Sequence, residues 1–196
     1  MFGRVERAKE KAFRGETFTK EELIELLSID PKSEEVEALG MAAHEVAQEV
    51  TEGKARLWGA IGVDYKPCEM DCKFCSLGKS WGIVKEEKEY TLKEMIRQVR
   101  YYVENDFHYI LLRSTEFYDP NSLGKIMKSI REAVPGDYEL GCNIGELEEA
   151  DAEYMYECGG RIAYHCIRLR EGVDTRFRVE DRVHTVEVIR DSKMKF

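Results

Sequence analysis

The sequence KPCEMDCKFCS, residues 66–76, gathers Cys68, Cys72 and Cys75 into one short loop with the spacing C-x3-C-x2-C. Three thiolates at this spacing can bind one metal centre without ligands from the rest of the chain. A structural zinc site takes four ligands, and ferredoxin-type loops bring four cysteines to their cubane clusters. Three cysteines on a four-iron cluster would leave one iron open. The loop therefore predicts a metal centre with a free position for chemistry.

Apolar segments before and after the loop predict a parallel α/β fold. We expect strands at residues 57–65, 109–112, 138–144 and 162–169, because these segments are apolar and lack helical spacing. A segment with apolar residues at helical spacing follows each of them, which gives four strand–helix units. Such alternation is typical of parallel strands joined by right-handed crossovers. Because the cysteine loop directly follows the first strand, we expect its site at the carboxyl ends of the strands.

The chain is short for a closed barrel. It has 196 residues, whereas eight strand–helix units usually take about 250. We therefore expect parallel (βα) units of a partial or incomplete TIM-type barrel over residues 57–196, lacking the C-terminal strands. A fifth strand should begin at residues 194–196. Residues 1–56 show helical spacing with a capping box at Thr19, and we expect them to form a separate N-terminal helical segment.

Composition and charge narrow the classes of function. The chain is 43% hydrophobic and 35% charged, with a formal net charge of -9. This balance is ordinary for a globular protein and argues against nucleic-acid binding, which needs clustered Lys and Arg. The N-terminus has no apolar stretch typical of a signal peptide, and no apolar run approaches the ~20 residues that cross a bilayer. We therefore expect a cytoplasmic protein with no membrane association.

The remaining cysteines leave the identity of the metal open. Cys142, Cys158 and Cys166 lie on predicted helices or strands, where a cytosolic protein commonly has buried thiols. A zinc site completed by His165, His108 or Cys142 is one alternative, and a reactive thiol cluster is another. The strand–helix context and the aromatic residue before the third loop cysteine favour an iron–sulfur cluster.

The loop resembles the signature of the radical S-adenosylmethionine superfamily, C-x3-C-x-aromatic-C, which Cys68, Cys72, Phe74 and Cys75 match in full. The preceding helices and the Cys-x-Phe-Cys-Ser run resemble the biotin-synthase-like branch, which includes biotin synthase, methylornithine synthase and hydrogenase-cofactor maturases. The resemblance covers about residues 20–196. It implies a 4Fe-4S cluster on the three cysteines and S-adenosyl-L-methionine (SAM) at the open iron, with Phe74 among the cofactor-binding residues.

The resemblance also implies an activity. An electron from an external donor would reduce the cluster and cleave SAM, and the resulting 5′-deoxyadenosyl radical would abstract hydrogen from a small-molecule substrate. Thiolate-bound clusters reach potentials as low as about -700 mV, which is consistent with this step. Cofactor biosynthesis is the expected setting. A partner chain or a homo-oligomer could complete the barrel.

Four residues outside the loop are implied to bind SAM. Glu116 lies in a Ser-Thr-Glu run, where the family often has Gly-Gly-Glu for the amino group of SAM. Arg168 and Glu171 lie where related enzymes place ribose- and carboxylate-binding groups, and Arg182 resembles an arginine that meets the SAM carboxylate. The alternative for Glu116 is a solvated loop carboxylate, and that for Arg168 and Glu171 is a surface salt bridge. The alternative for Arg182 is an exposed arginine paired with acidic neighbours on its own helix.

Two further expectations limit the function. Cys142 lies near the place of a second-cluster ligand in biotin synthase, but the partner position near Arg113 is not a cysteine, so we expect no second cluster. The competing hypothesis is a non-catalytic zinc or iron–sulfur module, or an inactive truncated fragment.

Overall fold

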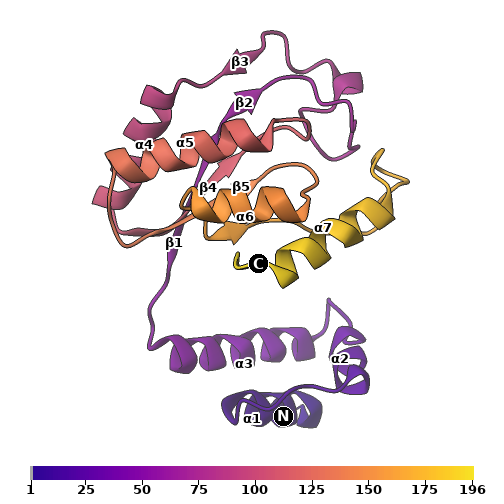
Figure 1. The fold of residues 1–196 in the computed structure, drawn as a ribbon. Helices are drawn as coiled ribbons and strands as arrows, with labels where there is room; N and C mark the ends of the chain where they lie inside the picture. Colours follow the sequence, from indigo (N-terminus) through magenta and orange to yellow (C-terminus); the bar gives the residue numbers. More distant parts are fainter. Residues whose placement is uncertain (1) are drawn as a thin grey trace. The chain divides into compact units, whose positions relative to one another are not determined.

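The computed structural model describes residues 2–196, which divide into two compact units with the boundary after residue 55. Three helices make up the first unit: α1 (Gly3–Phe13), α2 (Lys20–Leu27) and α3 (Glu34–Thr51) (Figure 1). The predicted capping box is confirmed at the start of α2, where Thr19 and Glu22 each accept the other's backbone N–H. The small core of this unit consists of Val5, Ile29 and Ala42.

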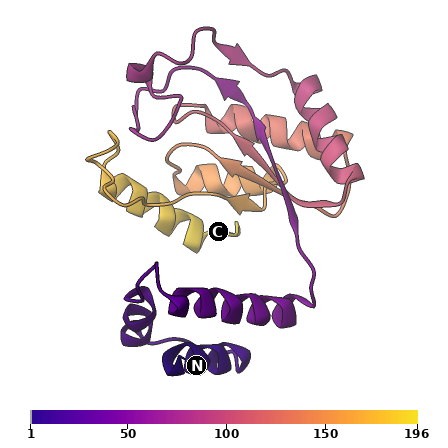
Figure 2. The same ribbon diagram turned by 180° about the vertical axis from the view of Figure 1, so that it is seen from behind.

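The second unit is built on a parallel four-stranded sheet with the strand order β1-β4-β5-β6. Its strands are β1 (Leu57–Gly62), β4 (Phe107–Arg113), β5 (Glu139–Asn143) and β6 (Ile162–Ala163). Its helices are α4 (Leu92–Glu104), α5 (Pro120–Ala133), α6 (Glu149–Glu157) and α7 (Val179–Asp191). All four helices lie on the same side of the sheet, as the two opposite views show (Figures 1 and 2). The predicted (βα) units of a partial barrel are confirmed.

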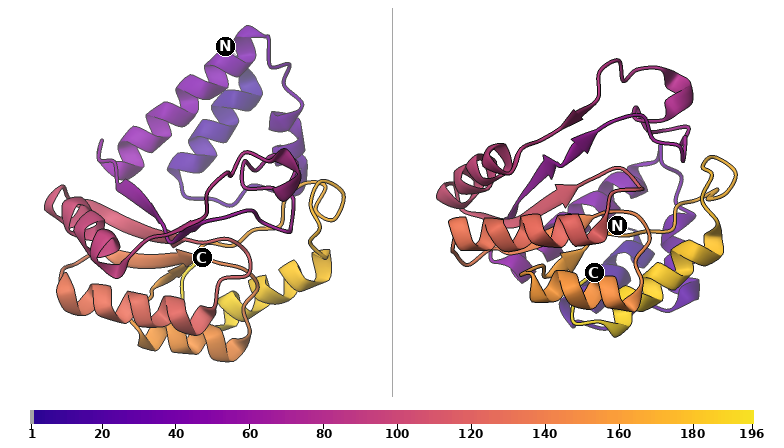
Figure 3. Two further views of the ribbon diagram at one scale, coloured as in Figure 1. Left: turned by 90° about the horizontal axis from the view of Figure 1, so that it is seen from above. Right: turned by 45° about the horizontal axis from the view of Figure 1, so that its top comes forward.

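A small excursion separates β1 from α4. It contains the antiparallel pair β2 (Asp64–Tyr65) and β3 (Lys88–Glu89), and the short 3-10 helix η1 (Lys79–Trp81). The cysteine loop, residues 66–76, lies between β2 and η1 (Figure 3). A second capping box, Thr91 with Glu94, is present at the start of α4, where the excursion ends.

The core lies between the sheet and the helices. Alternate strand residues such as Ile110, Leu112 and Leu140 point to the helical side, where Leu123 and Met127 of α5 are fully buried. The period of two in the strands and of 3.6 in the helices puts these apolar side chains on facing surfaces. Burial of apolar area at this interface is the main stabilising contribution.

The opposite face of the sheet is concave. Strands lie about 4.8 Å apart, so β1 and β6 would be separated by about 14 Å in a flat sheet. The rings of Trp58 on β1 and Tyr164 after β6 nevertheless lie 5.9 Å apart between centroids. A hollow of about 490 Å³ occupies this face, and its lining includes Trp58, Tyr109, Leu111, Ile162, Tyr164 and Phe196. The curvature is that expected of part of a barrel.

The fourth predicted strand is wrong beyond Ala163. The expected extent was residues 162–169, but β6 has two residues, and the chain leaves the sheet after Tyr164, whose N–H still donates to Cys142 at 2.8 Å. The Glu171 carboxylate accepts the backbone N–H of Arg168 at 3.1 Å, and Arg170 adopts a positive φ of 63°, so a tight turn replaces the strand. The apolar residues in this stretch do not indicate burial, because Leu169 is 95% exposed.

The predicted fifth strand position is confirmed at residues 194–196. Lys195 forms a parallel bridge with Ile162, accepting the N–H of Ala163 at 2.9 Å and donating its own to Arg161 at 2.8 Å. Within residues 2–196, no helix combines the length and the apolar character that crossing a membrane requires.

Candidate metal and cofactor site

The predicted site residues collect at one edge of the sheet. Gly62, Arg113 and Asn143 are in register at the ends of β1, β4 and β5. The segments that leave the strands here carry the cysteine loop, Glu116 and the residues from 164 to 178. This carboxyl edge is where parallel α/β folds place their active sites.

Backbone hydrogen bonds close the cysteine loop at its base. The N–H of Cys68 donates to Leu77 at 2.7 Å, and the N–H of Gly78 donates to Cys75 at 2.9 Å. Gly78 is required by a close approach, because a Cβ there would lie 2.8 Å from Cδ1 of Trp81. The loop is therefore a closed turn that carries its three thiols on a short span of chain.

One of the three thiols of the cysteine loop, that of Cys72, has a perturbed pKa. The pKa of Cys72 is raised to about 11, chiefly by burial and then by the neighbouring Cys75 and Cys68. No group of three His, Cys, Asp or Glu side chains in residues 2–196 is arranged to hold a single metal ion. A cubane takes one cysteine per iron, so its thiolates stand further apart than ligands around one ion, and this donor set fits such a cluster.

Arg168 and Phe74 lie beside the thiols. The guanidinium of Arg168 lies over the Phe74 ring, 5.4 Å from its centroid, and its positive charge opposes the rise in the pKa of Cys72. The carboxylate of Glu171 accepts the backbone N–H of Arg168 and, at 2.6 Å, the hydroxyl of Thr175. Both predicted residues of this segment therefore face the carboxyl edge.

Arg182 is the centre of a buried ionic cluster. Its side chain is 6% exposed and lies 3.2 Å from Glu146, 3.9 Å from Glu116 and 4.0 Å from Glu171. The guanidinium also lies over the ring of Phe177, 3.6 Å from its centroid. Its acidic partners come from other segments of the chain, so the alternative of an exposed arginine paired on its own helix is wrong.

Glu116 is held in an unusual electrostatic environment. Its side chain is 11% exposed, and burial raises its pKa to about 7, against the opposing charge of Arg182. Close backbone packing fixes its position, because a Cβ on Gly145 would lie 2.0 Å from the Glu116 carbonyl oxygen. The expected alternative of a solvated loop carboxylate is therefore wrong.

The buried Asp64 anchors the segment that carries Glu116. Its carboxylate accepts the N–H of Thr115 at 2.7 Å and the Thr115 hydroxyl at 2.5 Å, and lies 3.2 Å from Nζ of Lys66. Asp64 lies in β2, directly before the cysteine loop. The sequence gives no signal for this contact, which joins residues 51 positions apart.

Glu146 and His165 complete the ionic cluster, and neither was predicted to act there. His165 is buried with Nε2 3.2 Å from Arg182 and 3.4 Å from Glu146. Burial would raise the pKa of Glu146, but hydrogen bonds from His165 and Thr185 and the charge of Arg182 together lower it. The position of Glu146, shortly after the end of β5, is the signal that could have identified it.

The alternative zinc ligands either lie away from the cysteine loop or contact other side chains. Cys142 is buried in the core with its sulfur 3.6 Å from that of Met155, and burial raises its pKa to about 12. His108 lies at the start of β4, at the opposite edge of the sheet. His165 contacts Arg182 and Glu146 as described. The structure therefore supplies no fourth zinc ligand from these three residues.

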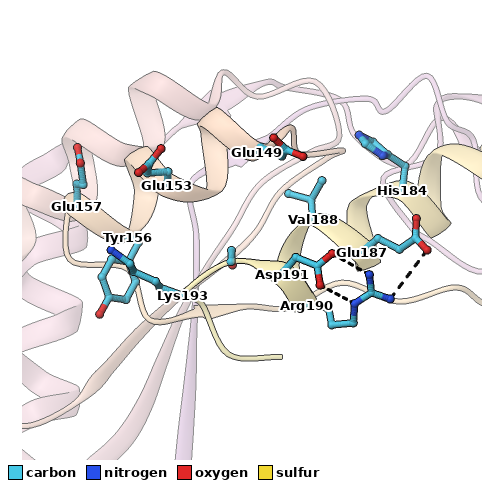
Figure 4. Close-up of a pocket in the computed structure, with 11 residues that line it drawn as sticks. Glu149, Glu153, Tyr156, Glu157, His184, Glu187, Val188, Arg190, Asp191 and Lys193 are labelled. Carbon is cyan, nitrogen blue, oxygen red and sulfur yellow. Dashed lines mark hydrogen bonds and ion pairs between the residues drawn. The ribbon is translucent and has the colours of Figure 1, made fainter.

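A second hollow, of about 520 Å³, lies between α6 and α7 (Figure 4). Its lining is mostly charged and includes Glu149, Glu153, Glu157, His184 and Glu187, with Arg190 paired to Asp191 at 2.8 Å. None of the predicted site residues lines it. We therefore place the functional site at the carboxyl edge.

Glu116→Gln is expected to stabilise the ligand-free protein in alkaline but not in acidic solution. A glutamate in an unfolded chain has a pKa of about 4.3, and folding raises that of Glu116 to about 7. The folded carboxyl therefore holds a proton that the unfolded one has lost, and this contribution to stability disappears as the pH rises through about 7. Glutamine does not titrate, so the variant should be more stable by about 1–3 kcal/mol at about pH 8.

Urea unfolding of both proteins between about pH 5 and pH 8 measures this difference. The exposed Glu153→Gln is the matched control and should give a difference that does not change with pH. A constant difference for Glu116→Gln across the same range would contradict the prediction.

No protein-family model matches this sequence, and no curated protein matches it either. Solved structures do match. The crystal structure of methylornithine synthase (PylB) is similar with a TM-score of 0.75 and 20% identity, covering 95% of this chain and 56% of that one. HydG, a maturase of the FeFe-hydrogenase, is similar with a TM-score of 0.73 and 16% identity, covering 96% of this chain and 44% of that one. HydG from Carboxydothermus hydrogenoformans is similar with a TM-score of 0.70 and 17% identity, covering 95% of this chain and 45% of that one.

These likenesses establish the fold. The chain spans about half the length of the solved proteins it matches. Methylornithine synthase and a hydrogenase maturase are among the proteins to which the cysteine signature pointed, so the structural relationship predicted from the sequence is confirmed.

Proposed function

We propose that this chain is a radical SAM protein of the biotin-synthase-like branch, in which Cys68, Cys72 and Cys75 bind a 4Fe-4S cluster. The observation that carries the proposal is the position of the loop that bears these three cysteines, at the carboxyl edge of a sheet with the fold of PylB and HydG. The donor set supports it, because thiolates are the ligands of iron–sulfur clusters and three of them leave one iron free for SAM.

The cluster, when bound, would supply one electron for reductive cleavage of SAM into methionine and the 5′-deoxyadenosyl radical, which abstracts hydrogen from a small-molecule substrate. The side chains of this protein would bind and orient the reactants and exclude water around them. Each cleavage of SAM consumes one electron, so the reaction requires an external electron donor. Cofactor biosynthesis remains our expectation for the setting of the reaction.

The charge around Arg182 suits a cationic ligand with one carboxylate. Three carboxylates lie within 4.0 Å of this single guanidinium, so the cluster of side chains has an excess of negative charge. SAM carries an ammonium, a sulfonium and one carboxylate, and is therefore cationic overall. Binding of the ammonium beside Glu116 would favour the ionised carboxylate and release the proton that its raised pKa retains.

Three buried polar atoms leave room for further hydrogen bonds. Within the described residues, Nε of Arg182, the hydroxyl of Ser114 and Oε1 of Glu146 have no hydrogen-bond partner. An unsatisfied buried donor costs about 1–3 kcal/mol, and a ligand carboxylate at Arg182 would satisfy one. We propose that Arg168 and Glu171 bind the ribose or the carboxylate of the same ligand, as the family resemblance implies.

Reconstitution without oxygen tests the proposal. The full chain is purified anaerobically and supplied with iron and sulfide, and its metals are counted. Dithionite and SAM are then added, and 5′-deoxyadenosine is measured with a control that lacks dithionite. About four irons per chain and reductant-dependent 5′-deoxyadenosine are expected. One tightly held zinc and no cleavage would overturn the proposal in favour of a metal-binding module, and a cluster without cleavage would restrict it to cluster binding.

A further inference from the structure

A segment from the far end of the sequence pairs with the cysteine loop. We define the β6–α7 segment as residues 164–178, which connect β6 with α7. The N–H of Lys73 in the cysteine loop donates to the carbonyl of Asp174 at 2.9 Å, and the N–H of Arg176 donates to the carbonyl of Met70 at 3.1 Å. These two bonds run in opposite directions and attach the middle of the loop to a segment about a hundred residues away in the sequence.

Side chains reinforce this attachment. The guanidinium of Arg176 donates to the carbonyl of Glu69 at 3.0 Å and to the carboxylate of Asp71 at 3.1 Å. Asp71 adopts a positive φ of 49° and also accepts the N–H of Ser80 at 2.8 Å. Nζ of Lys73 lies 2.9 Å from the carboxylate of Asp174. Arg176 thus contacts the turn between the first two cysteines at both a backbone and a side-chain oxygen.

The same segment carries Arg168 and Glu171, two of the residues proposed to bind SAM. Glu171 accepts the Arg168 N–H at one end of the turn and the Thr175 hydroxyl at the other. Thr175 also accepts the N–H of Gly172 at 3.0 Å. These bonds connect Arg168, which lies over Phe74, to Thr175. Arg176 is the next residue after Thr175.

We propose that Arg176 is a positioning residue that braces the cysteine loop through Glu69 and Asp71, so that the β6–α7 segment holds the three thiols in place. The role of the thiols as cluster ligands rests on the proposed function, whereas the brace itself is a property of the metal-free protein. Charge-assisted bonds of this kind hold a loop more strongly than neutral ones. Loss of the guanidinium weakens the attachment of the loop without removing any ligand.

Hydrogen exchange of the metal-free full chain tests the brace directly. In Arg176→Ala, the amides of residues 69–75 should exchange about tenfold faster than in the unaltered protein. Arg178→Ala is the matched control, because Arg178 is an exposed cation of the same segment whose only ion pair is with Asp181, at 3.8 Å, within the described residues. Arg176→Lys should give an intermediate rate, since an ammonium cannot reproduce the two-pronged contact.

Cluster retention gives a second readout. After reconstitution, iron loss to a chelator should be about tenfold faster in Arg176→Ala than in Arg178→Ala. Asp71→Asn should add little to Arg176→Ala, because both remove the same contact. Equal exchange in Arg176→Ala and Arg178→Ala would overturn the brace. If the unaltered chain binds no cluster, the proposed function fails, and the exchange comparison still decides the brace on its own.

Discussion

Replacing Cys72 with alanine is expected to abolish cluster binding. Reconstituted iron should fall from about four per chain to below about one, and SAM-dependent formation of 5′-deoxyadenosine should fall to background. Two thiolates cannot hold three irons of a cubane, and Cys72 is the thiol whose pKa both Cys68 and Cys75 raise. Iron and sulfide analysis, visible absorbance and low-temperature electron paramagnetic resonance after reduction measure the loss.

The matched control is Cys158→Ala. Cys158 is a buried thiol directly after α6, in contact with the hydrophobic core and outside the cysteine loop. This variant should retain the full iron content, with a modest loss of stability from the small cavity. Retention of the cluster in Cys72→Ala, or its equal loss in Cys158→Ala, would show that the cysteine loop is not the metal site.

The elements that the sequence predicted well are those with local signals. Capping boxes at Thr19 and Thr91, and Pro120 behind the N-cap Asp119, mark the beginnings of three helices. Each of these signals depends on residues within one helical turn, so no knowledge of distant contacts is needed. The strands β4 and β5 were equally clear, because their apolar runs are short and lack helical spacing.

The end of β6 could not be predicted for a physical reason. Tyr164, Ile167 and Leu169 give the stretch an apolar character, yet all three are exposed. Beyond the end of the strand, the Arg168 N–H donates to the carboxylate of Glu171, a local bond that competes with continued strand pairing. Such a competition depends on the geometry of the turn and leaves no periodic pattern in the sequence.

The site was predictable only where the sequence carries a motif. The cysteine spacing and the Ser-Thr-Glu run are local, and each residue they indicated lies at the carboxyl edge. The contact of Arg182 with Glu146 joins α7 to the segment after β5, and that of Thr115 with Asp64 joins two other strand ends. These contacts follow from the order of strands in the sheet, which spacing along the chain does not reveal.

Removal of the Arg182 guanidinium is expected to destabilise the protein strongly at about pH 8. Arg182→Met keeps a side chain of similar length but leaves Glu116, Glu146 and Glu171 without the cation that they surround. Breaking a buried ion pair by removing one partner typically costs about 3–5 kcal/mol. Urea unfolding should show a loss of this order, and binding of SAM to the reconstituted protein should be lost with it.

Acid should restore part of the stability of Arg182→Met. In the unaltered protein Arg182 opposes the rise in the pKa of Glu116, so the pKa of Glu116 should rise above about 7 in the variant. At about pH 5.5, Glu116 is then neutral in the folded variant, and one of the three like charges disappears. The destabilisation should therefore be smaller at about pH 5.5 than at about pH 8, while the exposed Arg178→Met should change stability by less than about 0.5 kcal/mol at both. A loss for Arg182→Met that does not depend on pH would indicate that lost packing on Phe177 dominates over the three carboxylates.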